Sequence, residues 1–313
     1  MTTQPIEYQS SRQPHKSWGI LWLPDEDVEV KGVVQICHGM CEYIERYAEF
    51  AAWLCKMGYA VCGNDHVGHK NTALLTSQRL GYFGGTDRWS RLIEDVELLR
   101  KKLAPRFAGL PWIMLGHSMG SFIARLYAEK YGNNLTALIL SGTAGKNPVI
   151  PAARAMATAA IAYRGPMFIS KTLDKMMSST LNKGIAHPQT PSDWVTSDQQ
   201  ILAKHANDPY CCFTFTVSAQ QDLFTMMLRC NRSDWFKALP KALPVLLFSG
   251  DKDSVGDFGK GPRQVSERLK AAGMRDVTLH LYPDGRHEML NEVNRQDVYQ
   301  DVYAWIVEHT ETA

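Results

Sequence analysis

Short apolar runs alternate with amphipathic stretches along the chain, and this pattern predicts alternating strands and helices. The apolar runs occupy residues 32–37, 59–63, 111–115, 135–142 and 245–250. Nearly continuous apolar runs of this length are typical of strands buried on both faces of a parallel sheet. Between them, residues 43–57 and 87–103 carry apolar side chains at helical spacing. The pattern therefore predicts an α/β protein.

The two ends of the chain continue the same organisation. The first thirty or so residues are predicted to form an N-terminal hairpin, with one strand at 17–24 and a polar turn at 25–27. Near the C-terminus we expect a helix within 259–273, a last strand at 277–282 and a final helix from about 296 to 308.

A long segment interrupts the alternation. Residues 144–242 separate two strand-like runs and are far longer than a crossover helix requires. We therefore predict a helical cap over 144–242, inserted into a core domain formed by 1–143 and 243–313. Such a cap would cover the carboxyl ends of the strands, where open α/β sheets bind ligands. Its candidate pocket residues are Met156, Met167, Met176 and Phe213, although the methionines could equally be packed inside the cap.

A G-x-S-x-G sequence at residues 116–120 is placed between an apolar strand and a helical run. In this context it predicts a sharp strand-to-helix turn that lifts the Ser118 hydroxyl above the sheet. Gly116 and Gly120 leave room for the close approach of strand and helix. We predict that Ser118 is a nucleophile; the alternative is a glycine-rich turn with an idle serine.

A serine nucleophile needs a histidine base, and the histidine needs a carboxylate to orient it. In this arrangement the order along the chain is serine, acid, histidine. His287 follows the last predicted strand and precedes the final helix, a placement that none of the other histidines shares. Among the acids after the preceding strand we favour Asp253, because Asp251 is close to the strand end and Asp257 is more typical of a turn or cap.

The transition state also needs two N–H donors for its oxyanion. The main-chain N–H groups of Met119, directly after Ser118, and of Met40, in the loop after the strand 32–37, are predicted to supply them. We interpret His38 as a turn residue that braces this loop. Glu42 and Arg46 could pair at i,i+4 and support it further.

Composition narrows the functional classes. Hydrophobic residues make up 45%, charged residues 21%, and the formal net charge is +2. No basic tract appears, so no nucleic-acid partner is predicted. Neither a signal core nor a membrane span is apparent. Seven cysteines without a regular framework favour free thiols in a reducing, cytoplasmic compartment, with redox chemistry at the vicinal pair Cys211–Cys212 as a minor alternative. The turn 64–69 holds two histidines and an aspartate, but we predict loop bracing there and no metal.

Taken together, the motifs resemble those of the serine α/β-hydrolases of the monoacylglycerol lipase, lysophospholipase and S33 serine aminopeptidase group. The group's H-G-x-x-E-x-x-x-R-Y pattern matches residues 38–47, D-H-x-G-H matches 65–69, and G-H-S-M-G matches 116–120. Its G-x-x-D matches residues 250–253, and its late histidine matches His287. The resemblance implies an α/β-hydrolase fold, with a mostly parallel eight-stranded sheet flanked by helices and a helical cap after the sixth strand.

We therefore predict a serine carboxylic-ester hydrolase that works through an acyl-enzyme on Ser118, without metal or organic cofactor. The apolar, Met-rich cap favours a small-molecule ester with an acyl chain, such as a monoacylglycerol or lysophospholipid. An aminopeptidase or amidase is an alternative, although residues 144–242 contain no glutamate to bind a substrate amine. A ligand-binding protein on a hydrolase fold is the other. The sequence does not predict an oligomeric state.

Overall fold

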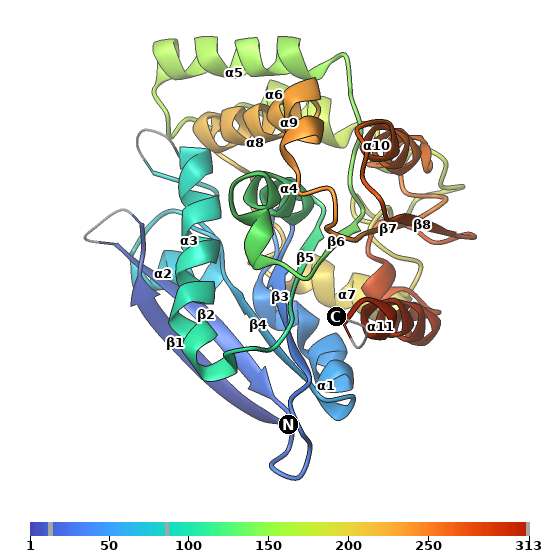
Figure 1. Ribbon diagram of the computed structural model, residues 1–313. Helices are drawn as coiled ribbons and strands as arrows, with labels where there is room; N and C mark the ends of the chain where they lie inside the picture. The colour runs from blue at the N-terminus through green and yellow to red at the C-terminus, as the bar shows by residue number, and fades with distance from the viewer. Residues whose placement is uncertain (12–14, 85–87, 311–313) are drawn as a thin grey trace.

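The computed structural model describes residues 1–11, 15–84 and 88–310, and their strands form one eight-stranded sheet (Figure 1). The strand order is β1-β2-β4-β3-β5-β6-β7-β8; β1 and β2 run antiparallel to their neighbours and the others are parallel. The strands are β1 (Thr2–Gln9), β2 (Lys16–Leu23), β3 (Gly32–Cys37), β4 (Tyr59–Asn64), β5 (Trp112–His117), β6 (Ala137–Ser141), β7 (Val245–Gly250) and β8 (Val277–Tyr282).

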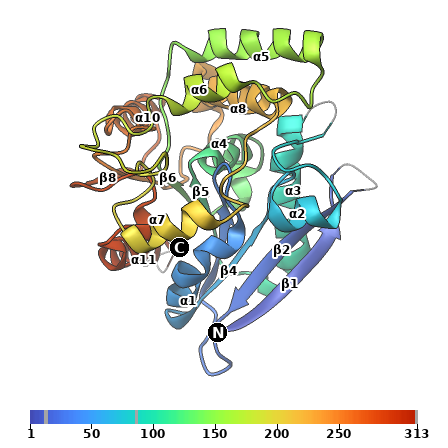
Figure 2. The ribbon, with the colours of Figure 1, turned by 180° about the vertical axis from the view of Figure 1, so that it is seen from behind.

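Helices cover both faces of this sheet. The core helices are α1 (Ala48–Lys56), α2 (Lys70–Leu75), α3 (Arg88–Leu103), α4 (Met119–Tyr131), α10 (Lys260–Ala271) and α11 (Arg295–Thr310). Helices α3, α4 and α10 pack their apolar sides into one buried cluster, and α1 and α11 into another on the opposite face (Figures 1 and 2). The sheet is thus the middle layer of three, which explains why β3, β4, β5, β6 and β7 are buried along their whole length.

The predicted strands are confirmed with small shifts at their ends. The last strand, 277–282, agrees residue for residue, and the run at 111–115 becomes β5, which continues to His117. The helix predicted over 43–57 divides into a short 3₁₀ helix, η1 (Ile44–Tyr47), followed by α1. The predicted start of α3 at Asp87 lies outside the described residues.

At the N-terminus, the strand predicted at 17–24 is β2, and it pairs with β1 over the full length of both strands. The polar turn at 25–27 leads from β2 to β3 and does not join the two arms of the hairpin. Most of β1 is exposed, with Ile6 and Tyr8 as its buried side chains, as expected for a strand at the sheet edge.

The regular structure of the fully described segment between β6 and β7 is α-helical, with loops and turns between the helices. It contains α5 (Ile150–Arg164), α6 (Lys171–Ser178), α7 (Gln199–Asn207), α8 (Val217–Cys230) and α9 (Ser233–Ala238). Helices α5, α6 and α8 lie together at one end of the molecule (Figures 1 and 2). Helix α8 also contributes Leu223 and Met226 to the apolar cluster of α3 and α4, so it is anchored to the core. A cap domain with boundaries at 144 and 242 remains a prediction.

Candidate functional site

Ser118 occupies a strained turn between β5 and α4. Its backbone has φ 51° and ψ −119°, a combination that residues with a side chain rarely adopt. A Cβ at Gly120 would collide with the carbonyl oxygen of Cys37 at the end of β3, and one at Gly116 would collide with the Gly120 carbonyl. The two glycines therefore permit the close crossing that holds the turn, and Ser118 stays partly exposed between buried neighbours.

Asp253 and His287 form a buried hydrogen-bonded pair. The distance from His287 Nδ1 to Asp253 Oδ1 is 3.0 Å, and both side chains are at most 2% exposed. The Ser249 hydroxyl donates to Asp253 Oδ2 at 2.8 Å, and the Val255 N–H donates to Oδ1 at 2.9 Å. Burial acts to raise the pKa of the Asp253 carboxyl, but the nearby His287 and these donors hold it below its ordinary value. The carboxylate is therefore ionised and fixes the orientation of the imidazole.

The other ring nitrogen of His287, Nε2, is left without a partner among the residues that the structure describes. Nε2 is buried and makes no hydrogen bond to any residue of the described chain. The ring packs against His117, the residue before Ser118, at 4.7 Å between centroids, and against Trp194 at 5.0 Å. Burial lowers the pKa of His287, whereas the carboxylates of Asp253 and Glu288 raise it, and the net shift is upward. The His287 ring thus packs on the residue that precedes Ser118, with the Asp253 carboxylate bonded to Nδ1.

The loop after β3 lies against the serine. A Cβ at Gly39 would be 3.2 Å from the Ser118 Cβ, so only glycine gives this approach without crowding. Neither the Met40 N–H nor the Met119 N–H donates to a described residue outside helix α4. Met119 is the first residue of that helix, where N–H groups have no intrahelical acceptor. Both predicted oxyanion donors are therefore unengaged by other segments.

The side chains of Glu42, Arg46 and Glu288 connect the loop after β3 with the loop after β8 that contains His287. Arg46 Nη1 donates to Glu42 at 2.7 Å and to Glu288 at 2.7 Å, and Nη2 donates to the second Glu288 oxygen at 2.7 Å. Glu42 also accepts hydrogen bonds from the Gly39 N–H and, at 2.8 Å, from the Tyr47 hydroxyl. The i,i+4 pair predicted from the sequence is confirmed. The link to Glu288 was not predicted, and its only sequence signal is its position next to His287.

A segment of the region between β6 and β7 also holds the histidine loop. The Glu288 N–H donates to the Val195 carbonyl at 2.8 Å, and the Arg286 guanidinium donates to the Asp193 and Thr196 carbonyls. Ser197 donates from both its N–H and its hydroxyl to Glu292. Trp194, whose ring packs on His287, belongs to the same segment. Its involvement was not predicted, because it depends on contacts about ninety residues apart.

The remaining predicted residues have different surroundings. Asp251 accepts the Asp284 N–H in a turn, and Asp257 has φ 48°, so both behave as turn residues. Met156 and Met167 are 43% and 45% exposed. Met176 packs against a small apolar cluster of α5, α6 and α8, whereas the Phe213 carbonyl accepts a hydrogen bond from Cys41 in the loop after β3. Of the four candidate lining residues, Phe213 thus has the most direct contact with the site.

Three buried histidines support the loop after β3 from behind. The Nε2 atom of His38 accepts the His66 main-chain N–H at 2.9 Å, and the centroids of the two imidazole rings lie 4.1 Å apart. His69 packs 5.0 Å from His38 and 5.5 Å from Phe213. The bracing role predicted for His38 is confirmed. Within the described ranges, no group of three or more His, Cys, Asp or Glu side chains is arranged to hold a metal ion.

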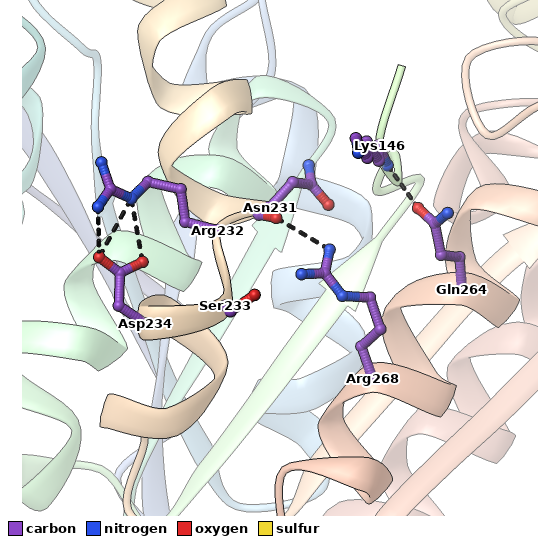
Figure 3. Close-up of a pocket in the computed structure, with 7 residues that line it drawn as sticks. All are labelled: Lys146, Asn231, Arg232, Ser233, Asp234, Gln264 and Arg268. Atoms are coloured by element: carbon purple, nitrogen blue, oxygen red, sulfur yellow. Dashed lines mark hydrogen bonds and ion pairs between the residues drawn. The ribbon is translucent and has the colours of Figure 1, made fainter. Parts of the chain in front are cut away.

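One surface cavity lies apart from Ser118, Asp253 and His287. Its volume is about 650 Å³, and its lining consists of polar and charged side chains (Figure 3): Lys146, Asn231, Arg232, Ser233, Asp234, Gln264 and Arg268. Arg232 pairs with Asp234, and Arg268 donates to the Asn231 carbonyl. Such a lining does not suit an apolar acyl chain, so this cavity is not a candidate acyl site.

Two further observations concern the whole chain. All seven cysteines are free thiols. No helix in the described ranges is long and apolar enough to cross a membrane.

A mostly parallel sheet with a strained serine turn after β5 and an Asp–His pair after β7 and β8 defines an α/β-hydrolase. The comparisons with known proteins agree. The model of one family, described as serine aminopeptidase S33, matches residues 28–294. The chain belongs to this serine aminopeptidase S33 family, as its motifs predicted.

Its relatives include named lipases and esterases. A monoacylglycerol lipase from Mycolicibacterium smegmatis is 29% identical over 96% of this chain and 99% of its own length. Human monoglyceride lipase is 27% identical over 90% of this chain and 84% of its own length. The solved structure of a thermostable carboxyl esterase from Bacillus coagulans in complex with glycerol superposes with a TM-score of 0.92, at 31% identity and 99% coverage of both chains.

Proposed function

We propose that this protein is a serine carboxylic-ester hydrolase that cleaves monoacylglycerols or similar single-chain esters through an acyl-enzyme on Ser118. The observation that carries the proposal is the Asp253–His287 pair, whose free Nε2 lies in a ring packed on His117, directly beside the strained Ser118 turn. The names of the relatives, monoacylglycerol lipase and carboxyl esterase, support the same class of substrate.

In the proposed acylation, the Ser118 oxygen attacks the ester carbonyl carbon while its proton passes to His287 Nε2. The Met40 and Met119 N–H groups bind the oxyanion that forms. The tetrahedral intermediate then collapses, the bond to the leaving oxygen breaks, and His287 donates its proton to that oxygen. Asp253 stays ionised throughout and stabilises the imidazolium.

Deacylation repeats the sequence with water as the nucleophile. His287 takes a proton from water, the hydroxide oxygen attacks the acyl carbon, and Ser118 leaves with the proton returned by His287. The products are a carboxylic acid and an alcohol. No metal or organic cofactor takes part in this proposal. Its partner is a small ester, and the free thiols support our further proposal of a reducing, cytoplasmic location.

The aspartates between β6 and β7 favour an ester over a peptide. A peptidase needs an available carboxylate to bind the substrate's amino group, and this region has six aspartates and no glutamate. Five already have partners: Asp193, Asp198, Asp208, Asp222 and Asp234. Asp174 alone among the six makes no side-chain hydrogen bond or ion pair with the described part of the chain, so an amine site in this region would have a single candidate carboxylate.

A chain-length series tests the proposal. We expect p-nitrophenyl esters from acetate to palmitate to be hydrolysed with a maximum at medium or long chains, and 1-monoacylglycerol to release glycerol. Ser118→Ala should lower kcat by about 10³-fold or more. A maximum at acetate would contradict the acyl-chain assignment. Hydrolysis of an aminoacyl p-nitroanilide in preference to the esters would favour a peptidase.

A further inference from the structure

We propose that Arg46 is a positioning residue for this hydrolysis, because its guanidinium fastens the loop that carries the Met40 N–H to the loop that carries His287. The inference rests on the proposed function and adds a role for a side chain that does not itself react. Arg46 belongs to η1, and its partner Glu288 lies 242 positions further along the chain.

Glu42 connects Arg46 to the loop after β3, which contains Gly39 and Met40. One Glu42 oxygen accepts the Gly39 N–H and the Tyr47 hydroxyl, and the other accepts Arg46 Nη1. Gly39 precedes Met40 and lies against Ser118. A shift of Glu42 would therefore move the peptide units that place the Met40 N–H.

Glu288 connects Arg46 to the loop after β8, which contains His287. Both Glu288 oxygens accept from Arg46 at 2.7 Å, in the bidentate geometry that guanidinium and carboxylate favour. Asn291 donates to the same carboxylate at 2.8 Å. Since Glu288 directly follows His287, this ion pair limits how far the imidazole can move away from Ser118.

Burial makes the connection strong and specific for arginine. The side chains of Arg46, Glu42 and Glu288 are 10%, 4% and 8% exposed, so water competes poorly for their hydrogen bonds. One guanidinium holds both carboxylates because Nη1 donates to Glu42 and to Glu288, while Nη2 donates to the second Glu288 oxygen within the same rigid plane. A lysine ammonium is a point charge on a flexible chain and cannot reproduce three such bonds at once.

The carboxylates of Glu288 and Glu42 also affect the pKa of His287. The imidazole faces Asp253, His117, Glu288 and, further away, Glu42. Although burial lowers the pKa of His287, the carboxylates of Asp253, Glu288 and Glu42 raise it. Conversion of Glu288 to a neutral side chain should therefore lower the pKa of His287, independently of any change in packing.

Arg46→Lys tests the positioning role. We expect kcat for the best p-nitrophenyl ester to fall by about 10–100-fold while KM changes by less than about threefold, because orientation of the reacting groups is lost and substrate binding is kept. Labelling of Ser118 by a fluorophosphonate should slow by a similar factor. The matched control is Arg295→Lys, since Arg295 also bridges two carboxylates, Glu49 and Asp198, and should keep wild-type kcat.

Glu288→Gln tests the same connection with a different measurement. The acid limb of the kcat/KM profile should move to lower pH by about 0.5–1 unit, and kcat should fall. Glu49→Gln, which removes the carboxylate next to Arg295, should leave the limb unchanged. Because a merely structural defect would not move the limb in this direction, the shift remains informative if Arg46→Lys fails to fold.

The outcomes separate the two proposals. If ester turnover by the wild type persists in Ser118→Ala, the proposed function fails and the role of Arg46 fails with it. If turnover depends on Ser118, but Arg46→Lys keeps wild-type kcat or Glu288→Gln leaves the acid limb in place, the inference about Arg46 alone is overturned.

Discussion

The indole ring of Trp194 lies 5.0 Å from the imidazole ring of His287, at an interplanar angle of 44°. Trp194 comes from the region between β6 and β7, whereas His287 follows β8. The two are joined by the main chain as well, since the His287 N–H donates to the Trp194 carbonyl at 3.4 Å. The proposed base is therefore packed against a side chain from outside the sheet.

Replacement of Trp194 should alter this base. In Trp194→Ala, water would reach the imidazole, and loss of desolvation should raise the pKa of His287 and move the acid limb of kcat/KM to higher pH. We expect kcat to fall about tenfold, since the ring is less firmly held. Trp194→Phe retains an aromatic contact and should stay within about threefold of wild type. Identical pH profiles for wild type and Trp194→Ala would contradict this role.

The carboxylate of Asp253 should matter through the tautomer of His287. Asp253→Asn keeps the size of the side chain but offers an N–H toward Nδ1, so Nε2 would carry the proton and could not accept one from Ser118. We expect kcat to fall by about 10³–10⁴-fold, with KM nearly unchanged. Asp251→Asn is the control, because Asp251 accepts a turn N–H and lies near the exposed Lys252, away from His287, and it should keep near-wild-type activity. Equal losses in both variants would reject Asp253 as the acid.

Buried histidines should make the fold sensitive to acid. Burial lowers the pKa of His66 and His117 to about 3 and of His69 to about 4, and it lowers that of His38 as well. Between these values and about 6.5, the unfolded chain binds protons that the folded chain does not. Each such histidine should therefore cost about 1.4 kcal/mol of unfolding free energy per unit of decreasing pH.

Asp65 acts in the opposite direction and offsets part of this loss, because burial raises the pKa of its carboxyl to about 7 and the folded state binds that proton more tightly. The pKa of His287 is also raised, but its contribution to stability changes only above about pH 6.5 and leaves the slope below that pH unaltered. Four histidines outweigh Asp65, and we expect the urea midpoint to fall steadily from pH 6.5 to pH 4.5. His66→Gln should flatten the slope. A constant midpoint over this range would show that the histidines are not buried in neutral form.

The crossing of β3 and α4 should tolerate no side chain at residue 120. In Gly120→Ala the added methyl group would meet the Cys37 and His38 carbonyl oxygens, both main-chain atoms that cannot rotate away. We expect a loss of about 3 kcal/mol or more in unfolding free energy, or insoluble protein. Gly109→Ala, where no atom lies within 4 Å of the added group, should cost only about 1 kcal/mol from its positive φ. Similar melting temperatures for the two variants would contradict the packing argument.

The strained turn at Ser118 was predictable from the sequence because strand, glycines and helix are consecutive there. The hydrogen bond between Asp253 and His287 was expected because each residue follows one of the last two strands of the sheet. The catalytic roles of Ser118, Asp253 and His287 remain predictions.

Features that depend on distant contacts were not predictable in the same way. Strand β1 lacks an apolar pattern, since its stability comes from pairing with β2. Glu288 and Trp194 gain their roles only when loops far apart in the chain meet. The methionine content of residues 144–242 suggested a pocket lining, yet Met156 lies on an exposed part of α5, because composition does not tell which side of a helix faces inward.

The bonds between residues 193–197 and the loop around His287 bear on protein engineering. Exchanging the helices between β6 and β7 for those of a relative is an obvious way to alter chain-length preference. In this protein those helices cannot be exchanged independently of the rest. Arg286 and Glu292 hold residues 193–197 against the loop that contains the proposed base, His287. A chimera that keeps residues 193–197 together with Arg286 and Glu292 should retain turnover. A chimera that replaces residues 193–197 but keeps Arg286 and Glu292 should lose turnover, because His287 would be displaced even if the chain-length preference had changed.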